Sequence, residues 1–139
     1  MKKVVKIMML AAVLMLTACN PSAEDMLIGR WKLYRAIETV VEASTGAATT
    51  DTLPGYDTQV MEFMSDATCF VADRGDTTFY MWSLTGGRTL ALWRDGWAED
   101  YYINALSNSL LVYSDTYSYY DSVSRRHYDY TYTFKYKKF

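Results

Sequence analysis

The sequence predicts an all-β protein, most simply an antiparallel up-and-down barrel of eight strands. Short runs that alternate apolar and polar residues recur from Ile28 to the C-terminus, and turn residues separate them. The last run, HYDYTYTFKYKKF over 127–139, has an aromatic residue at every second position. Helical periodicity is nearly absent. Eight such strands without helical cover close into a barrel or pack as a sandwich, and closure removes free edges.

The first 18 residues are typical of a bacterial lipoprotein signal peptide. A basic start precedes the apolar run Ile7–Leu16, which is too short to span a membrane as a helix. The run ends at Leu16-Thr17-Ala18-Cys19, which resembles the lipobox at which such precursors are cut and acylated. We therefore expect residues 1–18 to be removed and Cys19 to carry acyl chains such as palmitate. The alternative is an ordinary secretory signal in which Cys19 is incidental.

Cleavage before Cys19 would leave 121 of the 139 residues, which suits a single domain. Residues 19–26 are expected to be a lipidated tether, because Asn20–Asp25 has a polar composition suited to disorder. This segment also resembles the acidic export signals of Bacteroidetes surface lipoproteins. Residues 27–139 then form the barrel domain. The expected location is the outer membrane, with the periplasmic and cell-surface faces both open.

The charge of the mature chain excludes some partners. Loss of Lys2, Lys3 and Lys6 leaves eleven basic residues against sixteen acidic ones, a net charge of about −5. Nucleic acids and anionic membrane surfaces both require clustered positive charge. We expect no nucleic-acid partner, membrane attachment through the lipid anchor alone, and a monomer.

Each predicted strand is an alternating or β-branched run bounded by turn residues. In IGRWKLYRAI, Gly29, Trp31 and Leu33 share one face. Residues 42–56 are rich in Gly, Thr, Ala and Pro and are expected to be a long loop. The eight expected strands are Ile28–Ile37, Thr58–Ser65, Thr68–Asp73, Thr77–Leu84, Thr89–Trp93, Glu99–Ala105, Leu110–Tyr119 and Tyr128–Lys138.

Tight turns separate these strands. Gly86-Gly87 is typical of a hairpin turn, and a second turn is expected around Asp95-Gly96. Arg74-Gly75-Asp76 forms an R-G-D tripeptide, which in this context indicates a hairpin turn rather than an adhesion motif.

The first strand resembles the opening strand of lipocalin-like domains, with the family's G-x-W at Gly29 and Trp31. Later segments resemble small lipocalin-like lipoproteins of Bacteroidetes: Met61–Asp66, Tyr80–Leu84, Tyr101–Leu106 and Tyr132–Tyr136. The resemblance implies an eight-stranded barrel, with Trp31 packed across its closed end. It implies no ligand and no binding residue beyond the structural Gly29 and Trp31. Unlike better-known lipocalins, the chain is shorter, without a disulfide pair or C-terminal helix.

The sequence shows no catalytic constellation. His127 is the single histidine, and it is expected on the surface beside a loop. Cys69 lies in an apolar run and is interpreted as a buried, inert thiol. Carboxylates cluster only at turns and strand ends, where Asp is favoured for local hydrogen bonds. We expect no enzyme activity, no cofactor and no metal site.

Aromatic residues provide the remaining functional signal. Eight of the 13 tyrosines lie at or beyond Tyr113, and each hydroxyl needs a partner or water when buried. The candidate ligand contacts are Tyr128, Tyr130, Tyr132, Tyr136 and Trp82.

The sequence is compatible with two functions. The first is a binding module for a small hydrophobic or amphipathic ligand or a glycan. The second is a structural or interaction lipoprotein, whose filled barrel docks a partner in the envelope. An aromatic-lined cavity of about 300 Å³ or more favours the first.

Overall fold

The computed structural model describes residues 20–139, so Cys19 and the expected signal peptide lie outside the described residues. Residues 20–139 form one short helix and nine strands. In chain order these are α2 (Ala23–Leu27), β1 (Gly29–Glu42), β2 (Ala48–Leu53), β3 (Val60–Phe63), β4 (Thr68–Asp73), β5 (Asp76–Thr85), β6 (Thr89–Arg94), β7 (Trp97–Leu106), β8 (Leu110–Asp121) and β9 (Arg126–Lys138).

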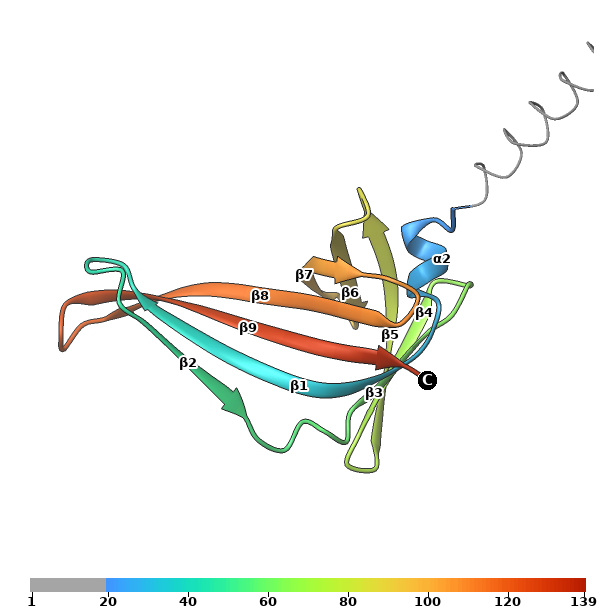
Figure 1. Ribbon diagram of the computed structural model, residues 1–139, viewed down its shortest axis with the longest axis horizontal. Coiled ribbons are helices and arrows are strands. Elements are labelled where there is room, and N and C mark those ends of the chain that lie inside the picture. Colours follow the sequence, from blue (N-terminus) through green and yellow to red (C-terminus); the bar gives the residue numbers. More distant parts are fainter. Residues whose placement is uncertain (1–19) are drawn as a thin grey trace, which may run out of the picture.

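The strands form a closed barrel. The sheet has the order β2-β1-β3-β4-β5-β6-β7-β8-β9, and β1 also pairs with β9. Strands β1 and β3–β9 therefore make a closed antiparallel up-and-down barrel of eight strands, to which β2 is appended (Figure 1). The predicted fold class is confirmed, and the sandwich alternative is wrong. The architecture is consistent with a lipocalin-like fold.

Three strands are much longer than the barrel needs. β1, β9 and β8 have 14, 13 and 12 residues, whereas β3 has four. They continue past the barrel rim as a long twisted ribbon (Figure 1). We call this projection the arm: β2 and residues 36–42, 115–121 and 126–133, in the order β2-β1-β9-β8.

The arm corrects one sequence expectation. Residues 42–56 are not one long loop, because Ala48–Leu53 forms β2 and pairs with Ala36–Val41 of β1. A hydrogen bond links the hydroxyls of Thr39 and Thr50 across this pair, with 3.2 Å between their oxygens. The segment has no alternating apolar residues because both of its faces lie outside the core.

The opposite end of the barrel is closed by Trp31 and α2. Trp31 is fully buried, and its indole Nε1 donates to the Leu27 carbonyl oxygen at 2.7 Å. Lys138 Nζ donates to the Met26 carbonyl oxygen at 2.8 Å and lies 5.0 Å from the centroid of the Trp31 ring. Two carbonyls at the C-terminus of α2 thus receive side-chain donors. Trp31 lies at the closed end, as the lipocalin-like resemblance implied.

Helix α2 begins where a disordered tether was expected. Ser22 caps the helix: its hydroxyl accepts from the Asp25 backbone N–H, while the Asp25 carboxylate accepts from the Ser22 N–H. This reciprocal pair is a capping box. Leu27 is fully buried and anchors the helix to the barrel. The polar segment before the fold is therefore shorter than predicted.

The barrel interior is filled around this closed end. Its core consists of Leu27, Trp31, Leu33, Met61, Phe63, Cys69, Trp82, Leu90, Leu92, Ile103, Leu111, Tyr113 and Tyr136. The two buried tyrosines have polar partners: Tyr136 donates its hydroxyl to Gln59, so Tyr113 donates to the Tyr136 oxygen across 2.9 Å. Among the described residues, no buried side-chain nitrogen or oxygen is without a partner.

Candidate functional site

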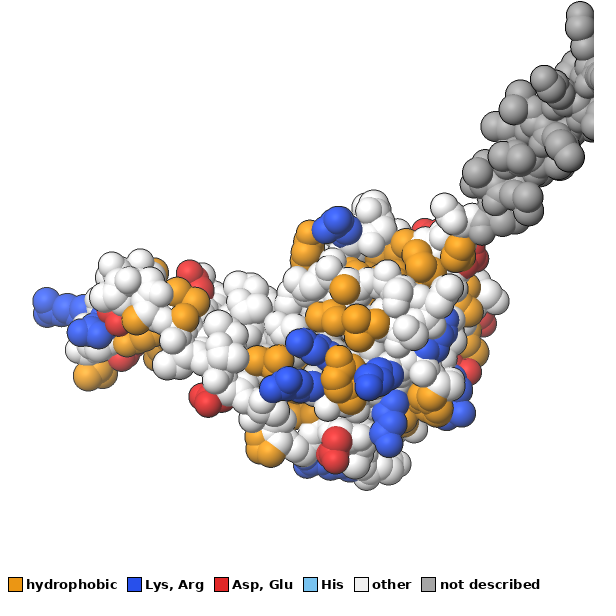
Figure 2. Space-filling view, in the orientation of Figure 1, with side chains coloured by type: hydrophobic (Ala, Val, Ile, Leu, Met, Phe, Trp, Pro, Cys, Tyr) orange, Lys and Arg blue, Asp and Glu red, His pale blue; other side chains and the backbone are white. Residues whose placement is uncertain are grey.

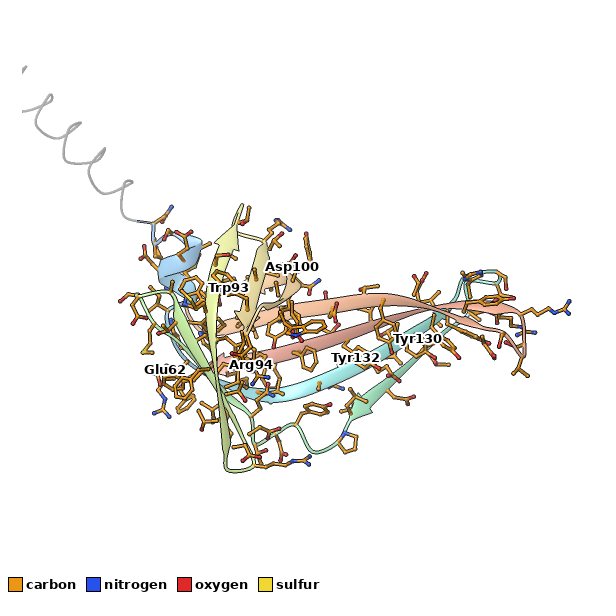
Figure 3. All side chains as sticks on the ribbon, turned by 180° about the vertical axis from the view of Figure 1, so that it is seen from behind. Glu62, Trp93, Arg94, Asp100, Tyr130 and Tyr132 are labelled. Carbon is orange, nitrogen blue, oxygen red and sulfur yellow. The ribbon has the colours of Figure 1, made fainter. Side chains whose placement is uncertain are left out.

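The alternating aromatic residues of β9 lie partly inside the barrel and partly beyond its rim. Tyr136 is fully buried in the core, where burial raises its pKa. Phe134 packs against the core. Tyr132 and Tyr130 continue on the same face beyond the rim and lie on the arm, as Figure 3 shows. Tyr128 follows them in the same alternation.

The other candidate, Trp82, belongs to the core. Its exposed fraction is 6%, and its indole Nε1 donates to the Met64 carbonyl oxygen at 3.1 Å. Its ring also meets Phe63 edge-on, with 5.6 Å between ring centroids. Of the five candidates, Trp82 and Tyr136 therefore lie in the filled part of the barrel, whereas the other three share the arm.

A pocket of about 350 Å³ opens at the end of the barrel opposite α2. It is lined by Tyr80, Leu92, Arg94, Asp95, Trp97 and Glu99. We call it the mouth pocket. Leu92 pairs with both Trp82 and Glu99, so these side chains share the inner face of the barrel. The pocket is thus the upper, unfilled part of the barrel interior.

A tight turn shapes the rim of this pocket. Arg94 pairs directly with Trp97, and Asp95 and Gly96 between them have φ of +53° and +82°. Such a two-residue Asp-Gly turn has both central residues at positive φ. The turn leaves Trp97 at the rim with 81% of its surface exposed.

The mouth pocket combines aromatic faces with charged groups. The Arg94 guanidinium lies 5.6 Å from the centroid of the Tyr80 ring and 3.5 Å from the Asp95 carboxylate. The Tyr101 hydroxyl donates to Glu99, and burial followed by this hydrogen bond raises the Tyr101 pKa. A ligand here would meet two aromatic rings, one cation and two carboxylates.

The arm carries a face of tyrosines. Cross-strand pairs place Tyr117 opposite Tyr130 and Tyr119 opposite Tyr128. The rings of Tyr117 and Tyr130 stack with 5.1 Å between centroids and an interplanar angle of 2°. Tyr117 also stacks on Tyr132, at 5.8 Å. We call this surface the tyrosine face.

Carboxylates form one row across the tyrosine face. Asp115 pairs with Tyr132, Tyr132 with Glu38, and Glu38 with Asp51. A hydrogen bond to Glu38 is the largest cause that raises the pKa of Tyr132. Within residues 20–139, none of the three carboxylates forms an ion pair. This row of the tyrosine face therefore carries a net negative charge.

The opposite face of the arm carries a row of threonines. Thr116, Thr131, Thr39 and Thr50 form a row across all four strands. The hydroxyl oxygens of Thr116 and Thr131 are 3.1 Å apart and form a hydrogen bond. We call this the threonine face; its row of threonines has neither the aromatic rings nor the carboxylates of the row that faces the other way.

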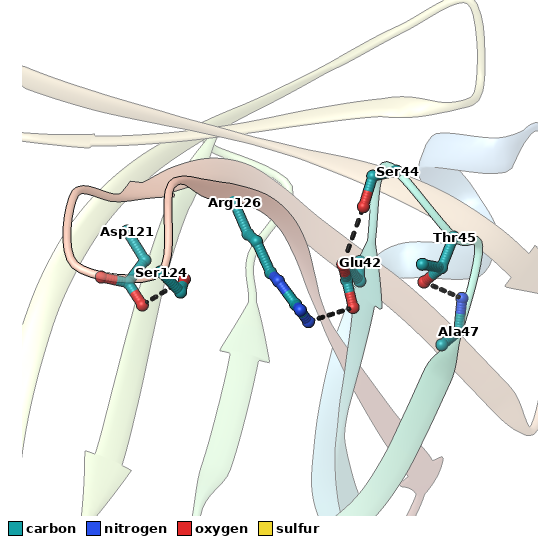
Figure 4. A network of polar contacts seen from close by, with 7 residues as sticks. All are labelled: Glu42, Ser44, Thr45, Ala47, Asp121, Ser124 and Arg126. Atoms are coloured by element: carbon teal, nitrogen blue, oxygen red, sulfur yellow. Dashed lines mark hydrogen bonds and ion pairs between the residues drawn. The ribbon is translucent and has the colours of Figure 1, made fainter.

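Polar contacts hold the tip of the arm together (Figure 4). Arg126 Nη1 donates to the Glu42 carboxylate at 3.2 Å, and the Ser44 hydroxyl donates to the same group at 2.7 Å. In the neighbouring turn, the Ser124 hydroxyl donates to Asp121 at 2.6 Å. The two hairpin turns at the tip are thereby joined side by side.

The described chain also contains two residues of types that are often catalytic, Cys69 and His127. Cys69 is buried, as expected, and burial raises its thiol pKa to about 12. His127 is exposed near the tip of the arm, with its ring 4.7 Å from that of Tyr120. Over residues 20–139, no three His, Cys, Asp or Glu side chains converge in a way that suits a metal ion.

Sequence reasoning missed the residues that line the mouth pocket. Alternation assigns Tyr80, Arg94 and Trp97 to inward faces, but it does not show where the filled core ends. Arg94 and Trp97 flank the Asp95-Gly96 turn, and this is the available signal for them, because side chains beside a tight turn lie at the barrel rim.

Fold and site together define a closed eight-stranded antiparallel barrel, consistent with a lipocalin-like fold, with an aromatic mouth and a projecting sheet. Comparison with protein-family models and with curated proteins gives no match to this chain. No helix of residues 20–139 has the length and apolarity needed to cross a membrane.

Proposed function

We propose that the protein is a non-catalytic, glycan-binding lipoprotein, anchored to the outer membrane through acylated Cys19. The observation that carries the binding function is the exposed Trp97 beside the mouth pocket, which also contains Tyr80, Arg94 and Glu99. Aromatic faces provide flat apolar surface for the C–H groups of a sugar ring. Charged side chains beside them donate to and accept from sugar hydroxyls.

The filled core favours an amphipathic ligand over a wholly apolar one. The interior below Leu92 is occupied by Trp82, Phe63 and the other core side chains, so an acyl chain would find no deep tunnel. The space that remains has charged groups at its rim. A sugar, with one apolar face and many hydroxyls, matches this mixture.

Intrinsic fluorescence tests the binding function. Neutral mono- and disaccharides that contain glucose or N-acetylglucosamine would be titrated into the protein, and a saturable blue shift in tryptophan emission is expected. The shift should disappear in Trp97→Ala, which removes an exposed side chain and leaves the core intact. Trp93→Ala is the matched control, because Trp93 pairs with Met81 on the outer wall. Absence of a shift across the panel, or its survival in Trp97→Ala, would contradict the proposal.

The lipid anchor has its own test. Labelling cells with a palmitate analogue should tag the protein and place it in the membrane fraction, and Cys19→Ala should abolish both. Protease treatment of intact cells then distinguishes the two orientations, since only a surface-exposed protein is degraded. Equal labelling of wild type and Cys19→Ala would refute acylation at this residue.

The second candidate function is docking of an envelope protein. It is favoured by the arm, whose outer strands β2 and β8 pair on one side only along residues 48–53 and 115–121 of the described chain. Open edges of this kind accept an added strand.

A further inference from the structure

We infer that the ligand is an extended, uncharged glycan chain that runs from the mouth pocket along the tyrosine face of the arm. This inference rests on the proposed glycan-binding function and names the class of glycan. It is carried by the position of the pocket and the tyrosine face at one end of the molecule, and by the charge and length of the tyrosine face.

Aromatic rings link the mouth pocket to the arm through the interior of the barrel, where Tyr113 is buried. Tyr101, whose hydroxyl donates to Glu99 of the pocket, lies 4.9 Å from Tyr113 between ring centroids. Tyr113 lies 5.4 Å from Phe134, and Phe134 is followed on the same face of β9 by Tyr132. The inner face of the barrel thus becomes the tyrosine face of the arm.

The open end of the barrel and the arm also lie at the same end of the molecule. Gly87, in the β5–β6 turn, approaches Ala23 of α2, since a Cβ added to Gly87 would lie 3.4 Å from the Ala23 Cβ. The β6–β7 turn and the tip of the β8–β9 hairpin therefore lie at the end away from α2. A chain that leaves the mouth pocket therefore emerges at the end of the barrel from which the arm projects.

The tyrosine face has the properties of a platform for sugar rings. Tyr117 and Tyr119 have 45% and 53% of their surfaces exposed, and Tyr130 and Tyr132 are half-buried. The tyrosine hydroxyls and the carboxylates of Glu38, Asp51 and Asp115 can accept from sugar hydroxyls. Tyrosine offers this area at a low cost in conformational entropy, because it has two rotatable bonds.

Charge excludes anionic glycans from this surface. The row Asp115-Tyr132-Glu38-Asp51 contains three carboxylates and no cation. Four basic residues of β1 and β9 lie on the outer wall of the barrel, where Lys32 pairs with Lys137 and Arg35 with Lys135. Arg126, at the tip of the arm, forms an ion pair with Glu42. Figure 2 shows Lys and Arg side chains gathered on the barrel and few of them on the arm. An acidic polysaccharide would be repelled from the tyrosine face.

The length of the surface indicates a chain longer than a disaccharide. Tyr128 and Phe134 are separated by about 20 Å at the rise of a strand, and the mouth pocket extends the track further. Successive sugar units would therefore occupy the pocket and then the rings of the arm. Such multiple contacts predict an affinity that rises with chain length.

The test is a titration series of increasing chain length. Dimers and hexamers of the cello-, chito-, malto- and laminari-oligosaccharides would be compared by calorimetry with hexagalacturonate, an anionic chain of equal length. We expect a neutral hexamer to bind more tightly than its own dimer, and hexagalacturonate to bind more weakly than that hexamer. A hexamer no tighter than its dimer in every series would overturn the inference while leaving the mouth pocket and the proposed function intact.

Substitutions on the arm test whether its tyrosines contribute to the affinity for a hexamer. Tyr117→Ala/Tyr130→Ala should weaken hexamer binding about two- to tenfold per ring and leave dimer binding unchanged. Thr116→Ala/Thr131→Ala, on the threonine face of the same strands, is the matched control and should change neither. Because the double alanine variant also removes the stacked ring pair within the arm, Tyr130→Phe is a second variant, for which a smaller loss of hexamer affinity is expected. Unchanged hexamer affinity in the tyrosine variants would place the longer chain elsewhere.

Neutralising the carboxylates tests the charge argument separately. Glu38→Gln/Asp115→Asn should strengthen binding of hexagalacturonate relative to wild type, because repulsion from the tyrosine face is removed. If hexagalacturonate already binds wild type more tightly than the neutral hexamers, the assignment to uncharged glycans is wrong. If no dimer and no hexamer binds, the proposed function itself fails.

Discussion

Gly29 holds a backbone conformation that other residues rarely adopt, with φ of +126°. A Cβ added to it would lie 2.7 Å from Lys138 Cε, in the side chain that donates to the Met26 carbonyl oxygen. The glycine of the G-x-W motif is therefore required both by the backbone and by the contact that closes the barrel. Trp31, two residues later, completes this closure.

Gly29→Ala should lower the free energy of unfolding by about 1–3 kcal/mol, because alanine is strained at this φ and displaces Lys138. Chemical denaturation measures the change. Gly46→Ala is the matched control, since Gly46 has φ of +70° and no atom within 4 Å of an added Cβ. Equal losses in the two variants would show that the Lys138 contact is unimportant.

Cys69 provides a second prediction at the residue scale. Burial raises its pKa to about 12 and removes it from solvent, so the thiolate is scarce at about pH 8. The folded protein should resist alkylation by iodoacetamide, and the denatured protein should react fully. Rapid alkylation under native conditions would mean that the core around β4 opens.

At the scale of elements, the arm tip depends on ionised carboxylates. The pKa of Glu42 is lowered from 4.5, chiefly by the Ser44 hydroxyl, and that of Asp121 from 3.8, chiefly by Ser124. A lowered pKa means that the folded state favours the ionised form. The resulting stabilisation is present above the ordinary pKa values and is lost as pH falls through the lowered ones.

Hydrogen exchange should therefore report acid loosening of the arm tip below about pH 4. The amides of Gly46, which donates to the Glu42 carbonyl oxygen, and Val123, which donates to Asp121, should lose protection before those of the barrel. Glu42→Gln should show weaker protection at Gly46 already at neutral pH. Protection at the tip that is independent of pH would refute a role for these carboxylates.

Two elements, β2 and α2, were not predicted from the sequence, and the physical reason differs between them. β2 has no apolar alternation to detect, since Ala48–Leu53 is exposed on both faces and is held by pairing with β1. Helix α2 did have a signal. Ser22 followed by Asp25 three residues later, just before Met26-Leu27, is the pattern of a capping box.

At the scale of the whole molecule, alternation predicted the barrel but not its rim. Every second residue from Tyr128 to Tyr136 shares a face, and this local pattern is identical inside and outside the barrel. The rim is set by a distant strand, because β7 pairs with β8 only as far as Ser114. The division between buried Tyr136 and the arm tyrosines thus depends on strand lengths across the sheet.

The same reason explains why the mouth pocket could not be predicted. Trp82 and Trp97 both occupy inward positions on strands, yet one is buried and the other has 81% of its surface exposed. Their difference arises from distance to the closed end, which only the register of all eight strands determines.

The proposed ligand binds at the open end of the barrel, and amide chemical-shift mapping tests this location most directly. Titration of the isotope-labelled protein with the tightest-binding neutral hexasaccharide should shift the amides of Trp97 and Glu99 together with those of Tyr130 and Tyr132. The amides around Trp31 and α2, at the closed end, should remain unchanged. Shifts confined to the closed end or the outer wall, or no shifts at all, would contradict the account.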